Sequence, residues 1–162
     1  MLRATRSYIA SNLTVSLNNQ LFLTGYSHGG HSCMALHREL EQYHAAEFQV
    51  TASAPMAGPY DLSGVMRGMI IQEVAYLSPS YLPYLLLAYD SIYDFPESPL
   101  DYFVDPYTTN LPPLFDGSLT CGEIDVQLPA IPIQIIRPAY RDAFTNKVNH
   151  PLRVALRAND VY

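Results

Sequence analysis

Hydrophobic residues change their spacing several times over the first sixty residues of the chain. In residues 2–13 they stand among helix-tolerant residues, which predicts the end of an amphipathic helix. Residues 20–24 contain a short apolar run, as in a central parallel strand that is covered on both faces. From His31 to about Ala46 apolar residues recur at helical spacing, with charged residues on the opposite face, and this pattern predicts a helix.

A second strand pattern follows over residues 48–54, and prolines end it within residues 55–59. A strand, a tight glycine turn, a helix and a second strand form a βαβ unit, in which the strands are parallel and the crossover is right-handed. The sequence therefore predicts the α/β fold class, with part of an α/β core in residues 1–61.

The character of the sequence changes after this core. The chain has 13 prolines and 13 tyrosines, and most of both lie after residue 61. Prolines at this density break helices into short pieces joined by turns. We predict a helical insertion over residues 62–140, acting as a cap or lid, rather than more sheet. Its aromatic and weakly charged character favours an acyl or aryl group over a charged substrate.

Composition and charge argue against several classes of function. The chain has 162 residues, of which 49% are hydrophobic and 15% are charged, as in a globular domain. The formal net charge is -6 without a basic stripe, which argues against a nucleic-acid partner. No stretch approaches the roughly 18 consecutive apolar residues of a membrane span, and no signal peptide is indicated. The two cysteines, Cys33 and Cys121, fit one disulfide or two free thiols and do not indicate a compartment.

The candidate chemistry lies between the first predicted strand and the helix, where residues 25–29 read Gly-Tyr-Ser-His-Gly. A serine hydroxyl attacks well only when a base removes its proton and the side chain is presented openly. A sharp strand-to-helix turn presents it at a strained backbone position with positive φ, and Gly25 and Gly29 avoid clashes on either side. Ser27 is thus the candidate nucleophile, and the N–H of His28 is the candidate oxyanion-hole donor.

A longer run around this turn carries a family resemblance. Residues 21–31 resemble the nucleophile elbow of secreted bacterial and fungal lipases and related α/β-hydrolases, in which Gln usually takes the place of His28. Residues 52–62 resemble the strand and loop after the elbow helix of that group, and the segment rich in Pro and Tyr resembles its helical cap. Residues 150–162 resemble the segment that leads into the next core strand, so a return toward the core is expected over residues 141–162.

The resemblance implies a partial α/β-hydrolase fold and a carboxylic ester hydrolase of the esterase or lipase type. Such an enzyme cleaves a small-molecule ester through a Ser, acid, His triad and an acyl-enzyme, here on Ser27, without a cofactor or metal. In the resembled group several core strands precede the elbow, and the triad acid and histidine follow later strands. We therefore expect this chain to be the central part of a longer enzyme and to have little activity alone. The group is extracellular or periplasmic, whereas the sequence itself indicates neither compartment nor oligomeric state.

Other residues and other functions also fit parts of the sequence. His150 follows Asp142 in the order of a triad, but both stand in a helical pattern, whereas a triad histidine belongs on a loop. Cys33, on the elbow helix, is expected to be a small buried residue rather than a second nucleophile. A non-catalytic binding module, or a serine peptidase or acyltransferase on the same scaffold, are the alternative functions.

Four histidines between residues 28 and 44 also suggest a metal site. His31, His37 and His44 do not repeat every three or four residues along the helix, and His28 occupies the elbow. No carboxylate completes the H-E-x-x-H arrangement of a zinc site. We expect these histidines to lie on the surface or to face the cap.

Overall fold

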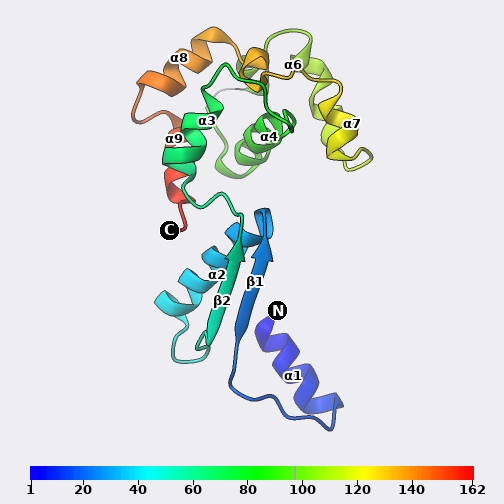
Figure 1. Ribbon diagram of the computed structural model, residues 1–162, viewed down its shortest axis with the longest axis vertical. Coiled ribbons are helices and arrows are strands. Elements are labelled where there is room, and N and C mark those ends of the chain that lie inside the picture. Colours follow the sequence, from blue (N-terminus) through cyan, green and yellow to red (C-terminus); the bar gives the residue numbers. More distant parts are fainter. Residues whose placement is uncertain (97) are drawn as a thin grey trace. The chain divides into compact units, whose positions relative to one another are not determined.

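Two parallel strands organise the N-terminal part of the chain. The computed structural model describes residues 1–96 and 98–162. Strand β1 (Phe22–Tyr26) pairs with β2 (Ala52–Met56) in parallel register, and helix α2 (His28–Tyr43) connects them (Figure 1). The predicted βαβ unit is therefore confirmed. Helix α2 begins three residues earlier and ends three residues sooner than the periodicity predicts, with Ser27 at its N-cap position and His44 at its C-cap position.

The two faces of this strand pair differ in burial. Exposure alternates along both strands, and the more buried positions, which include Ser53, face α2. The opposite face carries Phe22, Tyr26 and Met56, whose exposed fractions are 63%, 71% and 48%. The prediction of a strand covered on both faces is therefore wrong for the part of the chain that the structure describes, where one face is covered.

The limits of β2 differ from the predicted strand for two local reasons. Phe48 is buried, but its ring lies in a loop under the guanidinium group of Arg6, 4.3 Å from the ring centroid. At the other end, the strand continues through Pro55, which cannot donate to the ladder. The N–H of Ser27 donates to the carbonyl of Met56 at 2.9 Å and extends the pairing past the proline.

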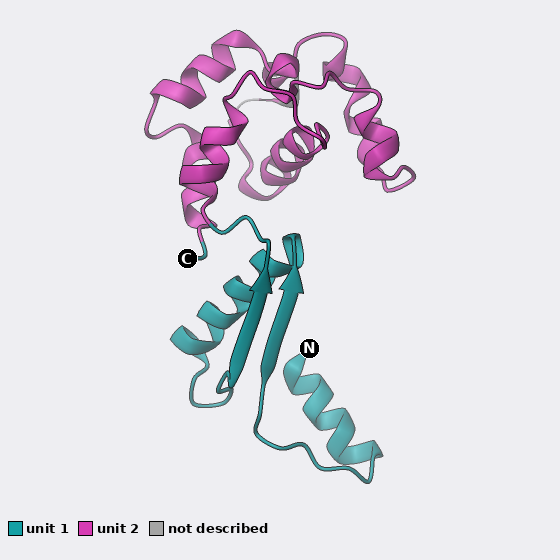
Figure 2. Cartoon of the chain, in the orientation of Figure 1, with its two compact units in different colours: residues 1–60, 161–162 teal, residues 61–160 magenta. Residues whose placement is uncertain are grey.

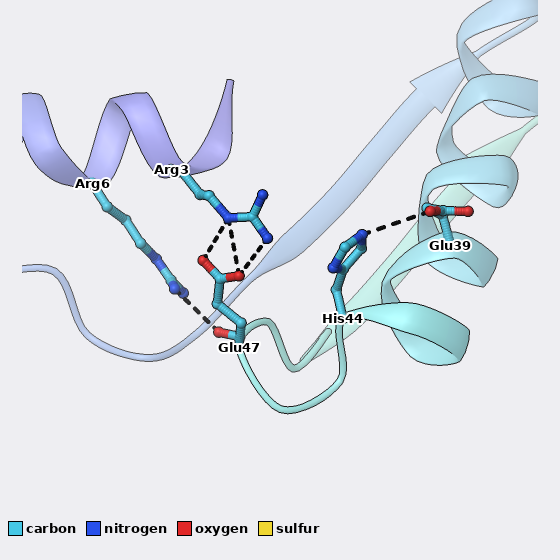
Figure 3. Close-up of polar contacts among 5 residues, drawn as sticks. All are labelled: Arg3, Arg6, Glu39, His44 and Glu47. Atoms are coloured by element: carbon cyan, nitrogen blue, oxygen red, sulfur yellow. Dashed lines mark hydrogen bonds and ion pairs between the residues drawn. The ribbon is translucent and has the colours of Figure 1, made fainter.

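Helix α1 (Leu2–Asn12) buries none of its residues and is held by charged contacts instead. Arg3 donates from Nε and Nη2 to the carboxylate of Glu47, at 3.0 and 2.6 Å, and Arg6 donates to the Glu47 backbone carbonyl at 3.1 Å (Figure 3). Hydrogen bonds from Arg3 hold the pKa of Glu47 below its ordinary value. Because folding lowers this pKa, the contact between Arg3 and the Glu47 carboxylate stabilises the fold near neutral pH. This stabilisation is lost as the pH falls through the lowered pKa of Glu47.

The second compact unit comprises residues 61–160, whereas residues 1–60 and 161–162 form the first (Figure 2). In its described residues, unit 2 is helical apart from an antiparallel bridge between Phe103 and Ile136. Its elements are η1 (Leu62–Met66), α3 (Arg67–Ile70), α4 (Tyr81–Tyr93), α5 (Pro99–Tyr102), α6 (Tyr107–Asn110), η2 (Pro112–Phe115), α7 (Cys121–Asp125), η3 (Pro132–Ile135), α8 (Pro138–Asn146) and α9 (Pro151–Ala158).

Prolines divide this unit into short helices, as the sequence predicts. Proline occupies the first turn of η2, η3, α8 and α9, where its missing N–H would be unpaired in any helix. The apolar run at residues 131–136, which has a strand-like pattern, forms η3 because Pro132 starts a helical turn there. Ile133 and Ile135 enter a core built around Tyr102, Phe103 and Leu111, all fully buried. The role of this unit as a lid stays a prediction.

Hydrogen bonds close unit 2 at its two ends. Asp160 accepts from the backbone N–H of Ser63 at 2.9 Å and from its hydroxyl at 2.6 Å. Beside them, the N–H of Val161 donates to the carbonyl of Tyr60 at 3.0 Å, within unit 1. The chain thus leaves and re-enters unit 1 at neighbouring residues. Compact unit 2 includes residues 141–160, which the sequence assigns to the return toward the core.

We predict that Glu47→Gln loosens α1, because the uncharged amide accepts more weakly from Arg3 and α1 itself buries none of its residues. Amide hydrogen exchange in residues 2–12 should become severalfold faster, while exchange in α2 is unchanged. Glu39→Gln is the matched control, since Glu39 pairs with His44 at 3.6 Å rather than with α1. Equal amide exchange rates in residues 2–12 of both variants would contradict the role of Glu47 in holding α1.

Candidate active site

Ser27 lies in the turn between β1 and α2 with an unusual backbone. Its φ is 56° and its ψ is -122°, so it adopts the positive φ that the sequence predicts for a nucleophile turn. Such a conformation costs on the order of 1–3 kcal/mol for a residue other than glycine and persists when its surroundings enforce it. The Ser27 carbonyl accepts from the N–H groups of Gly30 and His31, at 2.9 and 3.2 Å, and the side chain is exposed.

Close packing around two glycines enforces this turn. A Cβ on Gly25 would overlap the backbone carbonyl of Gly29, and a Cβ on Gly30 would lie 2.5 Å from the carbonyl oxygen of Met56. A Cβ on Gly29 would meet nothing within 4 Å among the described atoms. The clash predicted for a side chain at Gly25 is therefore present, whereas the tight position on the helix side is Gly30 and not Gly29.

The start of α2 offers backbone donors beside Ser27. In the described chain, the N–H groups of His28 and Gly29 have no hydrogen-bond acceptor, as is usual in the first turn of a helix. The helix dipole adds partial positive charge at the same end. A negative charge beside Ser27 can therefore be stabilised here, and the N–H of His28 is the donor that directly follows this serine.

The hydroxyl of Ser27 has no hydrogen-bond partner within the described part of the chain, and its side chain does not cap α2. A free serine hydroxyl is a weak nucleophile, because nothing takes up its proton. The turn therefore exposes the Ser27 hydroxyl beside backbone N–H donors. Within the described residues, no base contacts this hydroxyl.

The structure brings together a second serine and a histidine that the sequence analysis did not connect. His37 Nδ1 lies 2.9 Å from Ser53 Oγ, and His37 Nε2 lies 3.1 Å from the Glu41 carboxylate. These are the residue types of a catalytic triad, but Ser53 lies half-buried on the strand face that α2 covers. We assign this group to packing of α2 on β2. The His37 and Glu41 pair, four residues apart, is visible in the sequence, whereas the contact with Ser53 is not.

The remaining histidines of this region have separate partners. His31 Nδ1 lies 2.9 Å from the carbonyl of Pro59, and His44 pairs with Glu39 along the same helix. Across residues 1–96 and 98–162, no three side chains of His, Cys, Asp or Glu are grouped to hold a metal ion. In the same residues, no helix has both the length and the apolar character needed to cross a membrane.

The remaining candidates from the sequence are His150 and the two cysteines. His150 stands at the N-cap position of α9 and is 3% exposed, with its ring edge-on to Tyr140 at 4.9 Å and to Phe144 at 5.7 Å between centroids. A triad base has to reach substrate, so this enclosed setting argues against His150. Cys33 is buried on α2 and Cys121 is exposed, and both are free thiols.

Comparisons with known proteins support a hydrolase-like fold. No family model matches the sequence, and no curated protein matches it. The chain is similar to the crystal structure of the rice cell wall degrading esterase LipA from Xanthomonas oryzae, with 28% identity and a TM-score of 0.80, over 99% of this chain and 43% of that one. A candidate hydrolase from Legionella pneumophila is 25% identical, with a TM-score of 0.83, over 98% of this chain and 42% of its own.

A ligand-bound form of the same esterase gives 27% identity and a TM-score of 0.78, over 99% of this chain and 42% of that one. The chain thus spans less than half of the length of each of these structures. Its parallel strand pair and flanking helices are a mixed α/β arrangement of the kind found in an esterase and a candidate hydrolase.

We predict that Gly30→Ala lowers the free energy of unfolding by about 1–3 kcal/mol, because the added methyl group meets the rigid carbonyl of Met56. Gly29→Ala is the matched control one residue away, where the methyl group enters open space and stability should be unchanged or slightly raised. Urea unfolding of the two variants measures the difference. Equal losses in both would show that the approach of α2 to β2 is not the constraint.

Proposed function

We propose that this chain carries the nucleophile of a serine-type carboxylic ester hydrolase, with Ser27 forming the acyl-enzyme. The observation that carries the proposal is an exposed serine with positive φ between a parallel strand and the first turn of a helix. Similarity to an esterase over nearly the whole chain supports the same reaction class. Because the chain spans 43% of that esterase, the activity and the ester substrate of the whole protein are part of the proposal.

The proposed reaction follows from the groups around the turn. Ser27 Oγ attacks the ester carbonyl carbon while a base takes its proton, and the carbonyl oxygen becomes an oxyanion beside the His28 N–H. Collapse of this intermediate breaks the bond to the alcohol, which leaves with the proton, and an ester forms on Ser27. Water then attacks that ester and releases the carboxylic acid. Gly25 and Gly30 act indirectly, by holding the turn.

The reaction needs a general base that removes the proton of Ser27. The described residues place no base on the Ser27 hydroxyl, and His150 is enclosed by aromatic rings in unit 2. We propose that the base, a histidine in the resembled hydrolases, lies outside these residues. The chain alone should then exceed the uncatalysed rate by no more than about 10³ to 10⁴-fold, the level that remains when a triad is incomplete.

One observation favours a second candidate function. A turn that presents serine without a base is also what a non-catalytic binding module of this fold would contain. The two functions differ in one property, because a binding module forms no covalent bond with an ester, whereas the hydrolase requires one on Ser27.

We predict that added imidazole increases p-nitrophenyl acetate turnover by the purified chain, since Ser27 is exposed and no base contacts its hydroxyl within the described residues. The rate in excess of that of Ser27→Ala should rise with imidazole concentration, while Ser27→Ala shows only the reaction of imidazole with the ester. Initial rates of p-nitrophenolate release measure both.

Ser53→Ala is the matched control, because Ser53 already touches a histidine in the same unit. It should keep the imidazole-dependent excess rate if Ser27 is the nucleophile. A rate above that of imidazole alone that disappears in Ser53→Ala and remains in Ser27→Ala would assign the reaction to Ser53 and its neighbours His37 and Glu41. Identical rates in all three proteins at every imidazole concentration would favour the binding module.

A further inference from the structure

Unit 2 contains a group of arginines that carboxylates do not pair. Arg67 on α3, and Arg153 and Arg157 on α9, take part in none of the ion pairs among the described residues. The chain as a whole is acidic, with 15 Asp and Glu against 9 Lys and Arg. Residues 143–159 reverse this balance, because they include Lys147, Arg153 and Arg157 and no acidic residue. Arg67, Arg153 and Arg157 are called the arginine cluster below.

The members of the arginine cluster converge on the end of α8. Arg67 donates from Nη2 to the carbonyl oxygen of Thr145 at 3.0 Å, and Arg153 donates from Nη1 to the same oxygen at 3.2 Å. Arg157 follows Arg153 by one helical turn and donates to the carbonyl of Val148 at 3.2 Å. Thr145 lies in the last turn of α8 and Val148 just after it. Two separate helices therefore bring three positive charges to one place.

The carbonyl groups use only part of the hydrogen-bonding capacity of these side chains. A guanidinium group has five N–H donors, whereas a carbonyl oxygen has two lone pairs. The Nε atoms of Arg67 and Arg153 are buried and have no hydrogen-bond partner within the described residues. Burying part of a cation with unpaired donors costs free energy. The arginine cluster thus has donors in place for an acceptor that the described residues do not supply.

The positive charges also act on one another. Burial, and then the charges of Arg67 and Arg157, lower the pKa of Arg153 from its ordinary value. The ring of Phe144, with its centroid 6.0 Å from Cζ of Arg67, offsets part of one charge. The end of α8 contributes about half of an elementary negative charge, against three positive ones. One arginine suffices to cap this helix, so neutralising the whole cluster takes an added anion.

The number of charges selects the kind of anion. A phosphate group carries a charge of about −1.5 to −2 near neutral pH and has three acceptor oxygens, so it can accept from several guanidinium groups at once. A carboxylate brings a single charge. We propose that the arginine cluster binds the phosphate group of a soluble phosphorylated compound. The net charge of −6 opposes approach to an anionic lipid surface, which favours a soluble compound over a lipid head group.

This proposal does not rest on the ester hydrolysis, because the arginine cluster lies in unit 2 and Ser27 lies in unit 1. Calorimetric titration of the full chain with inorganic phosphate tests it, with sodium chloride at equal ionic strength as the blank. We expect saturable binding of one phosphate per chain, at least tenfold tighter than binding of acetate. Heats equal to those of the chloride blank, or acetate that binds as tightly as phosphate, would overturn the proposal.

Substitutions assign the binding to the arginine cluster. Arg153→Gln should weaken phosphate binding at least tenfold, and Arg153→Lys should weaken it less, because it keeps the charge and loses the planar fork. Arg157→Gln removes an exposed side chain, so it leaves the core intact and should weaken binding at least threefold. Arg141→Gln is the matched control on α8, because Arg141 already pairs with Glu73, and its affinity should be unchanged. Unchanged affinity in both Gln variants of the cluster would refute the assignment.

Vesicle co-sedimentation separates the two sources of a phosphate group. The probes are vesicles of phosphatidylcholine with and without phosphatidic acid, whose head group is a phosphomonoester. We expect the chain to bind both kinds of vesicle equally weakly while it binds inorganic phosphate. Binding only to the vesicles that contain phosphatidic acid, lost in Arg153→Gln, would rule out the soluble compound and assign the site to a lipid head group.

Discussion

The arrangement of the candidate active site depends on how closely the start of α2 approaches the two strands. The carbonyl of Gly29 occupies the place where Gly25 would carry a side chain, and the carbonyl of Met56 does the same for Gly30. This packing leaves no room for a methyl group, so the chain turns at Ser27 with positive φ. Backbone packing alone therefore exposes the Ser27 hydroxyl, without a contact to a catalytic partner. The same packing leaves the first amides of α2 unpaired.

Sequence reasoning succeeded where structure is determined locally. The spacing of glycines around Ser27, the apolar run before it and the helical period after it all lie within about twenty-five residues, and they predict the βαβ unit and the turn. Proline density predicts the short helices of unit 2 for the same reason. The strand predicted over residues 48–54 is wrong at Phe48. Its ring is buried beside two arginines of α1, so burial there arises without a strand.

Contacts between distant segments could not be predicted. Ser53 meets His37 because β2 lies beneath one particular face of α2, a register that neither segment encodes alone. The arginine cluster of unit 2 likewise combines α3, α9 and the end of α8. The serine lies in unit 1 and this cluster in unit 2, and each is formed by residues of its own unit.

The central claim is that Ser27 is the residue that becomes acylated. The most direct measurement is peptide mass mapping of the protein after brief reaction with p-nitrophenyl acetate in the presence of imidazole and rapid acid quenching. We expect an acetyl group on the peptide that contains Ser27, and no acetyl group on that peptide in Ser27→Ala. Acetylation of Ser53 in place of Ser27, or no acetylation of Ser27 above the level of other exposed serines, would contradict it.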